Sequence, residues 1–293
     1  MNIVLTLLAD LQQMWGFSFM RNAFEVGAMN AIVAGVTGYF VVLRRSAFTA
    51  HAFSEIGFAG AAAAVLLGGQ PILGLLGGST MGALAIAALG RRATNRDTQI
   101  GIVLAFALGL GILFISLYSG YANESYSILF GEIEGVSPFE VELTVVASAL
   151  VLFTVGVLYR PLLFASLDED VAEAQGMPMM LLGTAFMVIV AVAVSFAVQV
   201  TGVLLIFSLM VTPAATAQYL SRRPQGAIIL SATIALMATW VGLLLGWAAS
   251  YYPPTAKVPI SFFITAIVFC LYLAVRGIRL LAPRRLHRLP ATA

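Results

Sequence analysis

Three features follow one another between Ser166 and Pro224, and their order decides the fold. They are the acidic segment SLDEDVAEAQG (residues 166–176), an apolar run at 180–200, and the run TGVLLIFSLMVTPAATA (residues 201–217), which Arg222-Arg223-Pro224 closes. The acidic segment is too short and too polar to cross a bilayer. We interpret it as a short polar helix between membrane spans, with a surface that a cytoplasmic partner could push.

The composition is that of an integral membrane protein. Of the 293 residues, 61% are hydrophobic and 10% are charged, and the mean hydropathy is +1.00, well outside the usual range of soluble domains. The apolar runs are long and do not alternate with polar residues, which argues against a barrel and predicts an all-α bundle. The single cysteine, Cys270, lies in an apolar run, and we expect it to pack as a small hydrophobic residue.

Nine apolar runs predict the membrane crossings. They lie at about 22–43, 50–68, 71–90, 99–118, 138–159, 180–200, 203–220, 227–250 and 258–279. The 203–220 run is short and contains Pro213, so we expect it to be broken or tilted. The fold prediction is therefore a polytopic transmembrane helical bundle of about eight or nine spans. Small residues spaced by four, at Gly78 and Gly82 and at Gly242 and Gly246, predict close helix packing within it.

The basic residues test this arrangement, because arginine and lysine accumulate in cytoplasmic loops. With nine crossings, 13 of the 15 basic residues fall on one side, and only Arg21 and Lys257 fall on the other. The N-terminus is then outside and the C-terminus inside. The same orientation makes the acidic segment cytoplasmic and gives the outer loop 119–137 three glutamates and no basic residue. We interpret that loop as an acidic mouth, which could attract cations or simply be solvated.

The chain reads as one transmembrane domain with two short flanking segments. Residues 1–20 contain Asp10, Gln12 and Gln13 among apolar residues, which fits neither a signal peptide nor a good span, so we expect an interfacial helix. The transmembrane domain covers residues 21–280. Residues 281–293 form a basic cytoplasmic tail.

His51 and Glu55 are the candidate site residues. Polar groups inside spans are costly in lipid and therefore mark functional positions. These two residues are spaced i and i+4 within the second span, which places them on one helix face. Imidazole nitrogen and carboxylate oxygen are ligands for zinc, manganese or iron. A structural hydrogen bond between two buried polar groups is the alternative interpretation.

The sequence lacks a phosphate-binding loop, which needs a glycine-rich turn followed by lysine and a hydroxyl residue. The only lysine is Lys257, in an outer loop. We therefore expect that ATP, if it drives this protein, is hydrolysed by another subunit.

Three stretches together resemble a known family. They are VVLRR (41–45) leading into AHAFSE (50–55), LFG (129–131) with VSP (136–138), and GVLL (202–205) with PAATA (213–217). In this order and spacing the chain resembles, from about Ala23 to Leu273, the permeases of bacterial ATP-binding-cassette importers for divalent metals, the ABC-3 family. Members commonly carry an aspartate and then a histidine at the positions of His51 and Glu55, so the order of ligand types is exchanged here.

The resemblance implies a type II importer architecture and a set of partners. The pore would be a homodimer in the bacterial inner (plasma) membrane, with a cytoplasmic ATP-binding subunit and an extracytoplasmic metal-binding protein. No nucleic acid partner and no bound cofactor are expected, and the divalent metal ion is the cargo. The chain itself would not be an enzyme. The coupling segment 166–178 would contact the ATPase through Asp168, Glu169, Asp170, Glu173 and Gly176.

Three other functions stay open at this point. A permease for a chelated metal, such as a siderophore, would use the same motor but would need no role for His51. A proton-coupled secondary transporter would use Glu55 as the proton carrier and need no ATPase. The third is a membrane scaffold that transports nothing.

Overall fold

The structure is a computed structural model that describes residues 15–88, 96–118, 138–202, 206–251 and 259–281. The described residues form helices and short connections, with no β-strand among them. Eight of these helices are long and apolar enough to cross a membrane. They are α2 (Ser18–Leu43), α3 (Ala47–Leu66), α4 (Pro71–Ala88), α5 (Arg96–Leu117), α7 (Pro138–Leu167), α9 (Met179–Thr201), α11 (Pro224–Tyr251) and α12 (Ile260–Leu281).

The seventh predicted crossing is a shorter helix, α10 (Ile206–Leu220), which has 15 residues. At 1.5 Å per residue it is about 22 Å long, less than the roughly 30 Å of the hydrocarbon core. It follows Gly202, whose φ of +78° lies in the left-handed region and ends α9. Pro213 lies inside α10 and does not end it. The run is thus a short helix after a sharp break.

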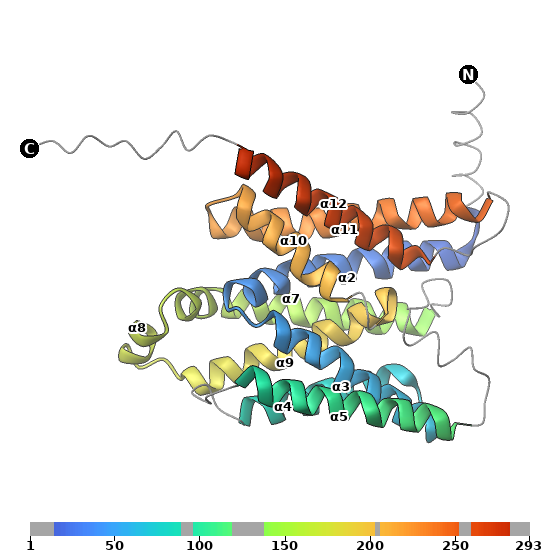
Figure 1. Cartoon of the computed structure of the whole chain (residues 1–293), viewed down its shortest axis with the longest axis horizontal. Helices are drawn as coiled ribbons and strands as arrows, with labels where there is room; N and C mark the ends of the chain where they lie inside the picture. Colours follow the sequence, from blue (N-terminus) through green and yellow to red (C-terminus); the bar gives the residue numbers. More distant parts are fainter. Residues whose placement is uncertain (1–14, 89–95, 119–137, 203–205, 252–258, 282–293) are drawn as a thin grey trace, which may run out of the picture.

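Consecutive spans run in alternate directions, and α10 keeps the alternation (Figure 1). The turn after α2 and the turn between α10 and α11 therefore lie at the same end of the bundle as the end of α12. Arginines lie at that end, whereas Arg21, near the start of α2, lies at the opposite end. The described helices agree with the arrangement that the basic residues predict, and the positive-inside rule makes the arginine-rich end cytoplasmic.

Helix α7 continues beyond its predicted end at residue 159 and reaches Leu167. Pro161 removes one backbone hydrogen bond, which usually breaks or kinks a helix. Here Leu162 and Ala165, in the turn that follows, are buried against the rest of the bundle. Packing therefore keeps α7 helical past the proline and carries it to the cytoplasmic end.

The small-residue spacings mark close helix contacts, as predicted. A Cβ atom built on Gly78 would lie 3.1 Å from the Cα of Gly60 across the contact between α3 and α4. Gly242 and Gly246 of α11 lie against Ile264 and Ile260 of α12. Such approaches are a main route to helix association in lipid. They fix α3 to α4 and α11 to α12.

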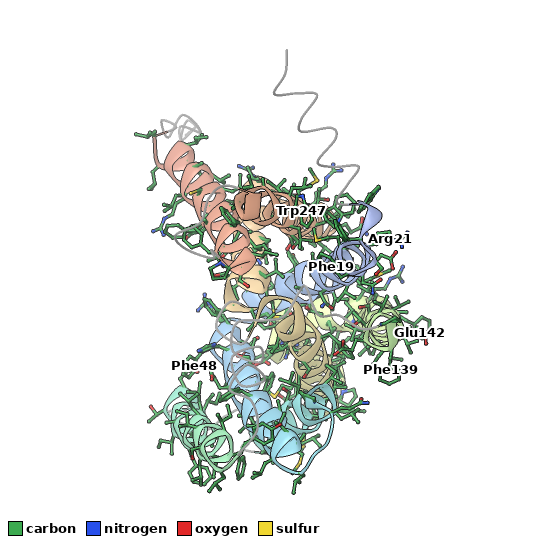
Figure 2. All side chains as sticks on the ribbon, turned by 90° about the vertical axis from the view of Figure 1, so that its right-hand side faces the viewer. Phe19, Arg21, Phe48, Phe139, Glu142 and Trp247 are labelled. Carbon is green, nitrogen blue, oxygen red and sulfur yellow. The ribbon has the colours of Figure 1, made fainter. Side chains whose placement is uncertain are left out.

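The helices form two groups that meet at α2, α7 and α9. α10 and α11 pack with α2, and α12 packs on α10 and α11. On the other side, α4 and α5 pack on α3, and α9 packs on α4. Figure 2 views the bundle from its outer end, with α11 and α12 on one side and α3 to α5 on the other. The rings of Phe19 and Trp247 lie 6.4 Å apart at this end, where aromatic residues often meet the lipid headgroups.

One sequence prediction about packing is wrong. Cys270 is exposed on the surface of α12 and does not pack inside the chain. Helix α12 buries few of its residues, and its apolar face points outward. In a membrane protein an apolar run marks contact with lipid as readily as contact with protein, so hydropathy alone does not separate the two.

Candidate functional site

The turn between α2 and α3 fixes where the candidate site lies. The N–H of Arg44 donates to the carbonyl of Phe40 at 2.9 Å, and the N–H of Ser46 donates to the carbonyl of Val41 at 2.9 Å. Arg45 between them has a φ of +52°, the left-handed conformation that commonly ends a helix. The chain therefore reverses within three residues, and α3 starts at Ala47. His51 lies about one turn into α3.

His51 and Glu55 lie together on α3, as their spacing predicts. The His51 Nε2 atom is 4.0 Å from a carboxylate oxygen of Glu55. This distance is too long for a direct hydrogen bond, and it leaves a gap between two metal-ligating atoms. The Glu55 side chain is buried at 7% exposure, whereas that of His51 is 32% exposed. The imidazole of His51 is thus more accessible than the buried carboxylate of Glu55.

The helices around this pair hold α3 in place. The hydroxyl of Ser79 on α4 donates to the carbonyl of Phe53 at 2.8 Å, in the turn between His51 and Glu55. On the opposite side the His51 ring meets the ring of Phe207 on α10 edge to face, with centroids 6.0 Å apart. The pair therefore lies where the α3 group of helices faces α10. The Nδ1 atom of His51 is buried and accepts or donates no hydrogen bond among the described residues.

Two ligands do not complete a metal site. Among the described residues there is no group of three or more His, Cys, Asp or Glu side chains that could hold an ion. The pair nevertheless has the right chemistry, because one nitrogen and one carboxylate ligand suit borderline divalent metals. A closed coordination shell would need ligands from beyond the described part of this chain, such as a second copy.

The acidic segment folds as the short helix α8 (Glu169–Ala174). Asp168 caps it, because its carboxylate accepts from the N–H of Val171 at 3.1 Å. Gly176 follows with a φ of +78°, which favours glycine and turns the chain toward α9. Within α8, Ala172 is buried, whereas Asp170 and Glu173 are exposed. Figure 1 shows α8 projecting from the cytoplasmic end of the bundle.

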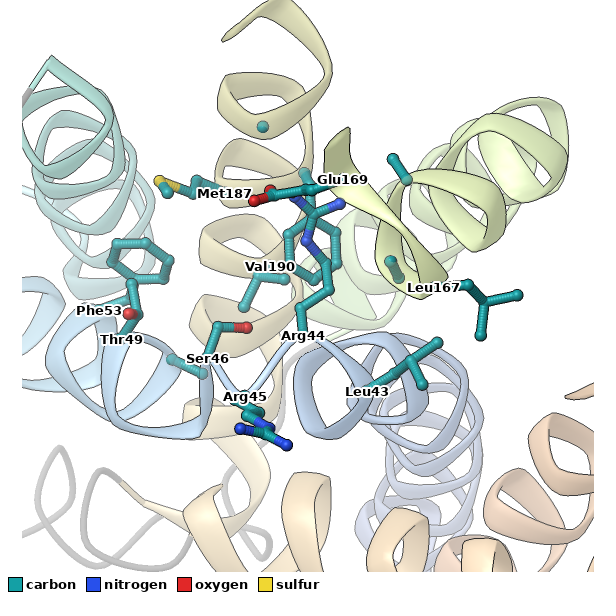
Figure 3. Close-up of a pocket in the computed structure, with 15 residues that line it drawn as sticks. Leu43, Arg44, Arg45, Ser46, Thr49, Phe53, Leu167, Glu169, Met187 and Val190 are labelled. Carbon is teal, nitrogen blue, oxygen red and sulfur yellow. The ribbon is translucent and has the colours of Figure 1, made fainter. Parts of the chain in front are cut away.

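A cavity of about 480 Å³ lies between α8 and the turn that precedes α3. Arg44, Ser46, Glu169 and Phe186 are among its lining residues. Figure 3 shows the side chains of Arg44 and Glu169 directed toward each other across it, with Arg45 pointing away. An Arg44 nitrogen lies 4.0 Å from a Glu169 carboxylate oxygen. The sequence analysis singled out Glu169 as a coupling residue, but it used Arg44 only as a sign of topology and as part of the family resemblance. No local spacing links the two residues.

Several predicted features lie outside the described residues. They are the acidic outer loop 119–137, the greater part of the interfacial segment at 1–14, and the basic tail at 282–293. Of the segment 1–20, residues 18–20 belong to the start of α2.

The eight long apolar helices define a multi-pass membrane protein, and its similarity to a bacterial membrane transport family makes it a protein of the bacterial plasma membrane. A family model matches residues 16–276, nearly the whole described chain. The protein belongs to the ABC 3 transport family.

Relatives and solved structures agree with this assignment. The manganese transport system membrane protein MntC of Listeria monocytogenes is 28% identical over 260 residues, which cover 88% of this chain and 92% of MntC. The structure of PsaBC from Streptococcus pneumoniae in complex with Fab is similar with a TM-score of 0.82 and 27% identity, covering 93% of this chain and 99% of that one. An inward-facing ABC transporter described as of metal-chelate type has a TM-score of 0.66 at 16% identity, covering 86% and 84%, and shares the fold.

Proposed function

We propose that this protein is the permease subunit of an ATP-binding-cassette importer that carries a divalent metal ion into the cytoplasm. One observation on this chain's own residues supports the proposal. His51 and Glu55 place an imidazole nitrogen and a carboxylate oxygen 4.0 Å apart on one face of α3, inside the membrane-spanning bundle. A metal-ligating pair at that depth is costly in lipid, which favours a function for it.

The ion binds between two copies of the chain in this proposal. Each copy contributes His51 and Glu55, and four ligands complete the tetrahedral shell that zinc prefers, or part of the larger shell of other ions. The partial exposure of His51 and the absence of a third ligand among the described residues support a site shared between protomers. Transport also requires that this shared site bind the ion with modest affinity, because a site that holds the ion too tightly does not release it.

Manganese is the first candidate cargo, because the similar MntC protein is named as a manganese transport protein. Zinc and iron are the alternatives, because nitrogen and oxygen ligands accept all three ions. An extracytoplasmic metal-binding protein would deliver the ion to the outer end.

ATP hydrolysis takes place on a separate cytoplasmic subunit in this scheme, so the chain itself is not an enzyme. Within the permease domain 21–280, segment 166–178 is the coupling segment. Asp168 shapes it by capping α8, and Gly176 provides the turn. Glu169 was predicted to contact the ATPase as well, but it faces Arg44, so in this proposal the exposed Asp170 and Glu173 make that contact. Residues 1–20 are proposed as the outer interfacial segment and 281–293 as the basic cytoplasmic tail.

Proteoliposomes that contain this chain and its ATPase subunit test the proposal. Uptake of radiolabelled manganese, zinc and iron is measured with and without ATP, using free ions and the same ions bound to a chelator. We expect ATP-dependent accumulation of a free ion. Accumulation that does not depend on ATP but is lost when a proton gradient is dissipated would indicate a proton-coupled transporter and contradict the ATP-driven scheme. Transport of the chelated form alone would mean that His51 and Glu55 take no part in the mechanism.

A further inference from the structure

Arg44 is a buried cation at the junction of three elements. It is the residue that follows the last turn of α2, and its side chain is only 13% exposed. Its guanidinium lies 4.0 Å from the carboxylate of Glu169, the first residue of α8, and 5.0 Å from the ring centre of Phe186 on α9. An arginine with little exposure needs such partners, because an unpaired charge in this position is strongly destabilising.

The contact to Glu169 is the part of this arrangement that reaches α8. Glu169 is half exposed, and α8 is a single short helix that projects from the bundle. The ion pair therefore joins a peripheral element to a buried one. The pair lines the cavity of about 480 Å³ (Figure 3), and this space would let the two side chains move.

The turn between α2 and α3, which holds Arg44 at the other end of this ion pair, is rigid. Arg44 and Ser46 are fixed to the last turn of α2 by backbone hydrogen bonds, and the Ser46 hydroxyl adds a third bond to the Val41 carbonyl at 3.2 Å. The Ser46 carbonyl in turn accepts from the N–H of Ala50, in the first turn of α3. A displacement of Arg44 thus reaches the backbone next to His51 without passing through a flexible loop.

We propose that Arg44 is a positioning residue that transmits the movement of α8 to the start of α3, and so to the His51 and Glu55 pair. The proposal rests on the proposed function, because it assumes that an ATPase moves α8. When α8 moves, Glu169 draws the guanidinium with it, and the tight turn tilts α3. The guanidinium also contacts the ring face of Phe186 on α9, and it can keep this contact while it moves because arginine stacks on aromatic rings.

Arg45 provides a matched control within the same turn. It also lines the cavity and carries the same charge, but its side chain points away from Glu169 (Figure 3). An Arg45→Gln variant removes one positive charge from the cytoplasmic end without touching the ion pair. Any effect of net charge on membrane insertion or on ATPase docking is then shared with Arg44→Gln.

The test uses the complete transporter in proteoliposomes with manganese as the probe ion. Four variants are compared with the unaltered chain: Arg44→Gln, Glu169→Gln, the two combined, and Arg45→Gln. The measurements are copurification of the ATPase subunit, the rate of ATP hydrolysis, equilibrium manganese binding, and manganese transported per ATP. We expect Arg44→Gln and Glu169→Gln to lower transport per ATP about fivefold or more, the range of coupling between sites in proteins, while docking, hydrolysis and binding persist.

The combined variant decides whether the two residues act together. If they form one connection, the double change is no worse than Arg44→Gln alone, because the second change removes a contact that is already lost. Losses that add in the double variant, or a drop for Arg45→Gln equal to that for Arg44→Gln, would refute the proposal. So would full coupling in Glu169→Gln, a half-exposed site where folding is not at risk.

The failures of the two proposals are distinguishable. If the unaltered chain neither binds an ATPase subunit nor transports manganese, zinc or iron with ATP, the proposed function is wrong, and Arg44 has no movement to transmit. If the unaltered chain transports and the Glu169→Gln variant transports equally well per ATP, only the role of Arg44 is wrong. Parallel loss of manganese binding and docking in Arg44→Gln, with normal Glu169→Gln, would indicate a purely structural arginine.

Discussion

At the scale of single residues, the polar pair on α3 is the least expected feature of an apolar bundle. A charged side chain at mid-bilayer costs about 2.5–3.5 kcal/mol on insertion scales, and Glu55 is almost completely buried. A structural role would ask for a short hydrogen bond that repays this cost, yet the nearest atoms of His51 and Glu55 are 4.0 Å apart. A bridging ion would satisfy both groups at once.

Exchanging the two ligand types tests this interpretation. We expect His51→Gln and Glu55→Gln each to weaken metal uptake by more than about tenfold, at least the loss that follows removal of supporting residues in metal sites. The exchange His51→Glu with Glu55→His keeps one nitrogen and one carboxylate on the same helix face and should retain most of the uptake. Uptake of radiolabelled ion in proteoliposomes is the measurement.

Ser54→Ala is the control for this exchange. Its hydroxyl lies between the pair in sequence but donates to the carbonyl of His51 in its own helix. We expect normal uptake from this variant. Normal uptake in both glutamine variants as well would rule out the pair as the ion site.

Arg45 carries a second prediction at this scale. Its φ of +52° places an L-residue in the left-handed region, which costs roughly 1–2 kcal/mol. Glycine removes that strain but loses about 0.5–1 kcal/mol in chain entropy, so Arg45→Gly should be as stable as the parent or slightly more so. Arg45→Val adds a β-branched side chain at the same φ and should melt earlier. Thermal unfolding of the purified protein in detergent measures both, and equal melting of the two variants would contradict the strain.

At the scale of elements, hydropathy predicts where most helices lie because lipid imposes a minimum apolar length. The two deviations have different causes. α7 passes Pro161 because Leu162 and Ala165 gain burial, and α9 ends at Gly202, whose φ is +78°. Neither the burial at the end of α7 nor the backbone conformation of Gly202 is contained in a one-dimensional hydropathy pattern.

One part of the candidate site can be predicted from the sequence, and another part cannot. The proximity of His51 and Glu55 follows from helical spacing and is therefore visible in the sequence. The contact between Arg44 and Glu169 joins the end of α2 to α8, with α3, α4, α5 and α7 between them in the chain. Only the packing of the whole bundle brings these two residues together.

The contact between α3 and α4 gives the prediction at this scale. A Cβ atom on Gly60 would overlap the carbonyl oxygen of Gly74, so Gly60→Ala should destabilise the protein by about 1–3 kcal/mol, as other overpacked sites do. Gly77 on the same α4 has nothing within 4 Å, and Gly77→Ala should be neutral or stabilising by up to about 1 kcal/mol. Thermal unfolding in detergent separates the two, and equal behaviour would mean that α3 and α4 are not in close contact.

At the scale of the whole molecule, the two helix groups give the site its setting. α3 is fixed to α4 by close glycine contacts, whereas it has far fewer contacts with α10, among them the edge-to-face contact of His51 with Phe207. A boundary with few interlocking side chains can open more easily than one with a close-packed backbone. A relative movement of the two groups would therefore change access to His51 while leaving its own helix pair intact.

The orientation of the molecule in the membrane is the last prediction, and cysteine labelling measures it. With the exposed Cys270 replaced by alanine, a new cysteine is placed either at Glu142, exposed near the outer end of α7, or at Gln175, exposed beside α8. Because arginine gathers at the α8 end of the bundle, a membrane-impermeant thiol reagent should label Glu142→Cys in intact cells and Gln175→Cys only after the membrane is opened. Arg21→Cys, at the start of α2, is the control for the outer face and should be labelled with Glu142→Cys. The reverse pattern would invert the transporter and place α8 beyond the reach of a cytoplasmic ATPase. Labelling of Arg21→Cys and Gln175→Cys from the same side would contradict the odd number of crossings between these two positions, which are α2, α3, α4, α5 and α7.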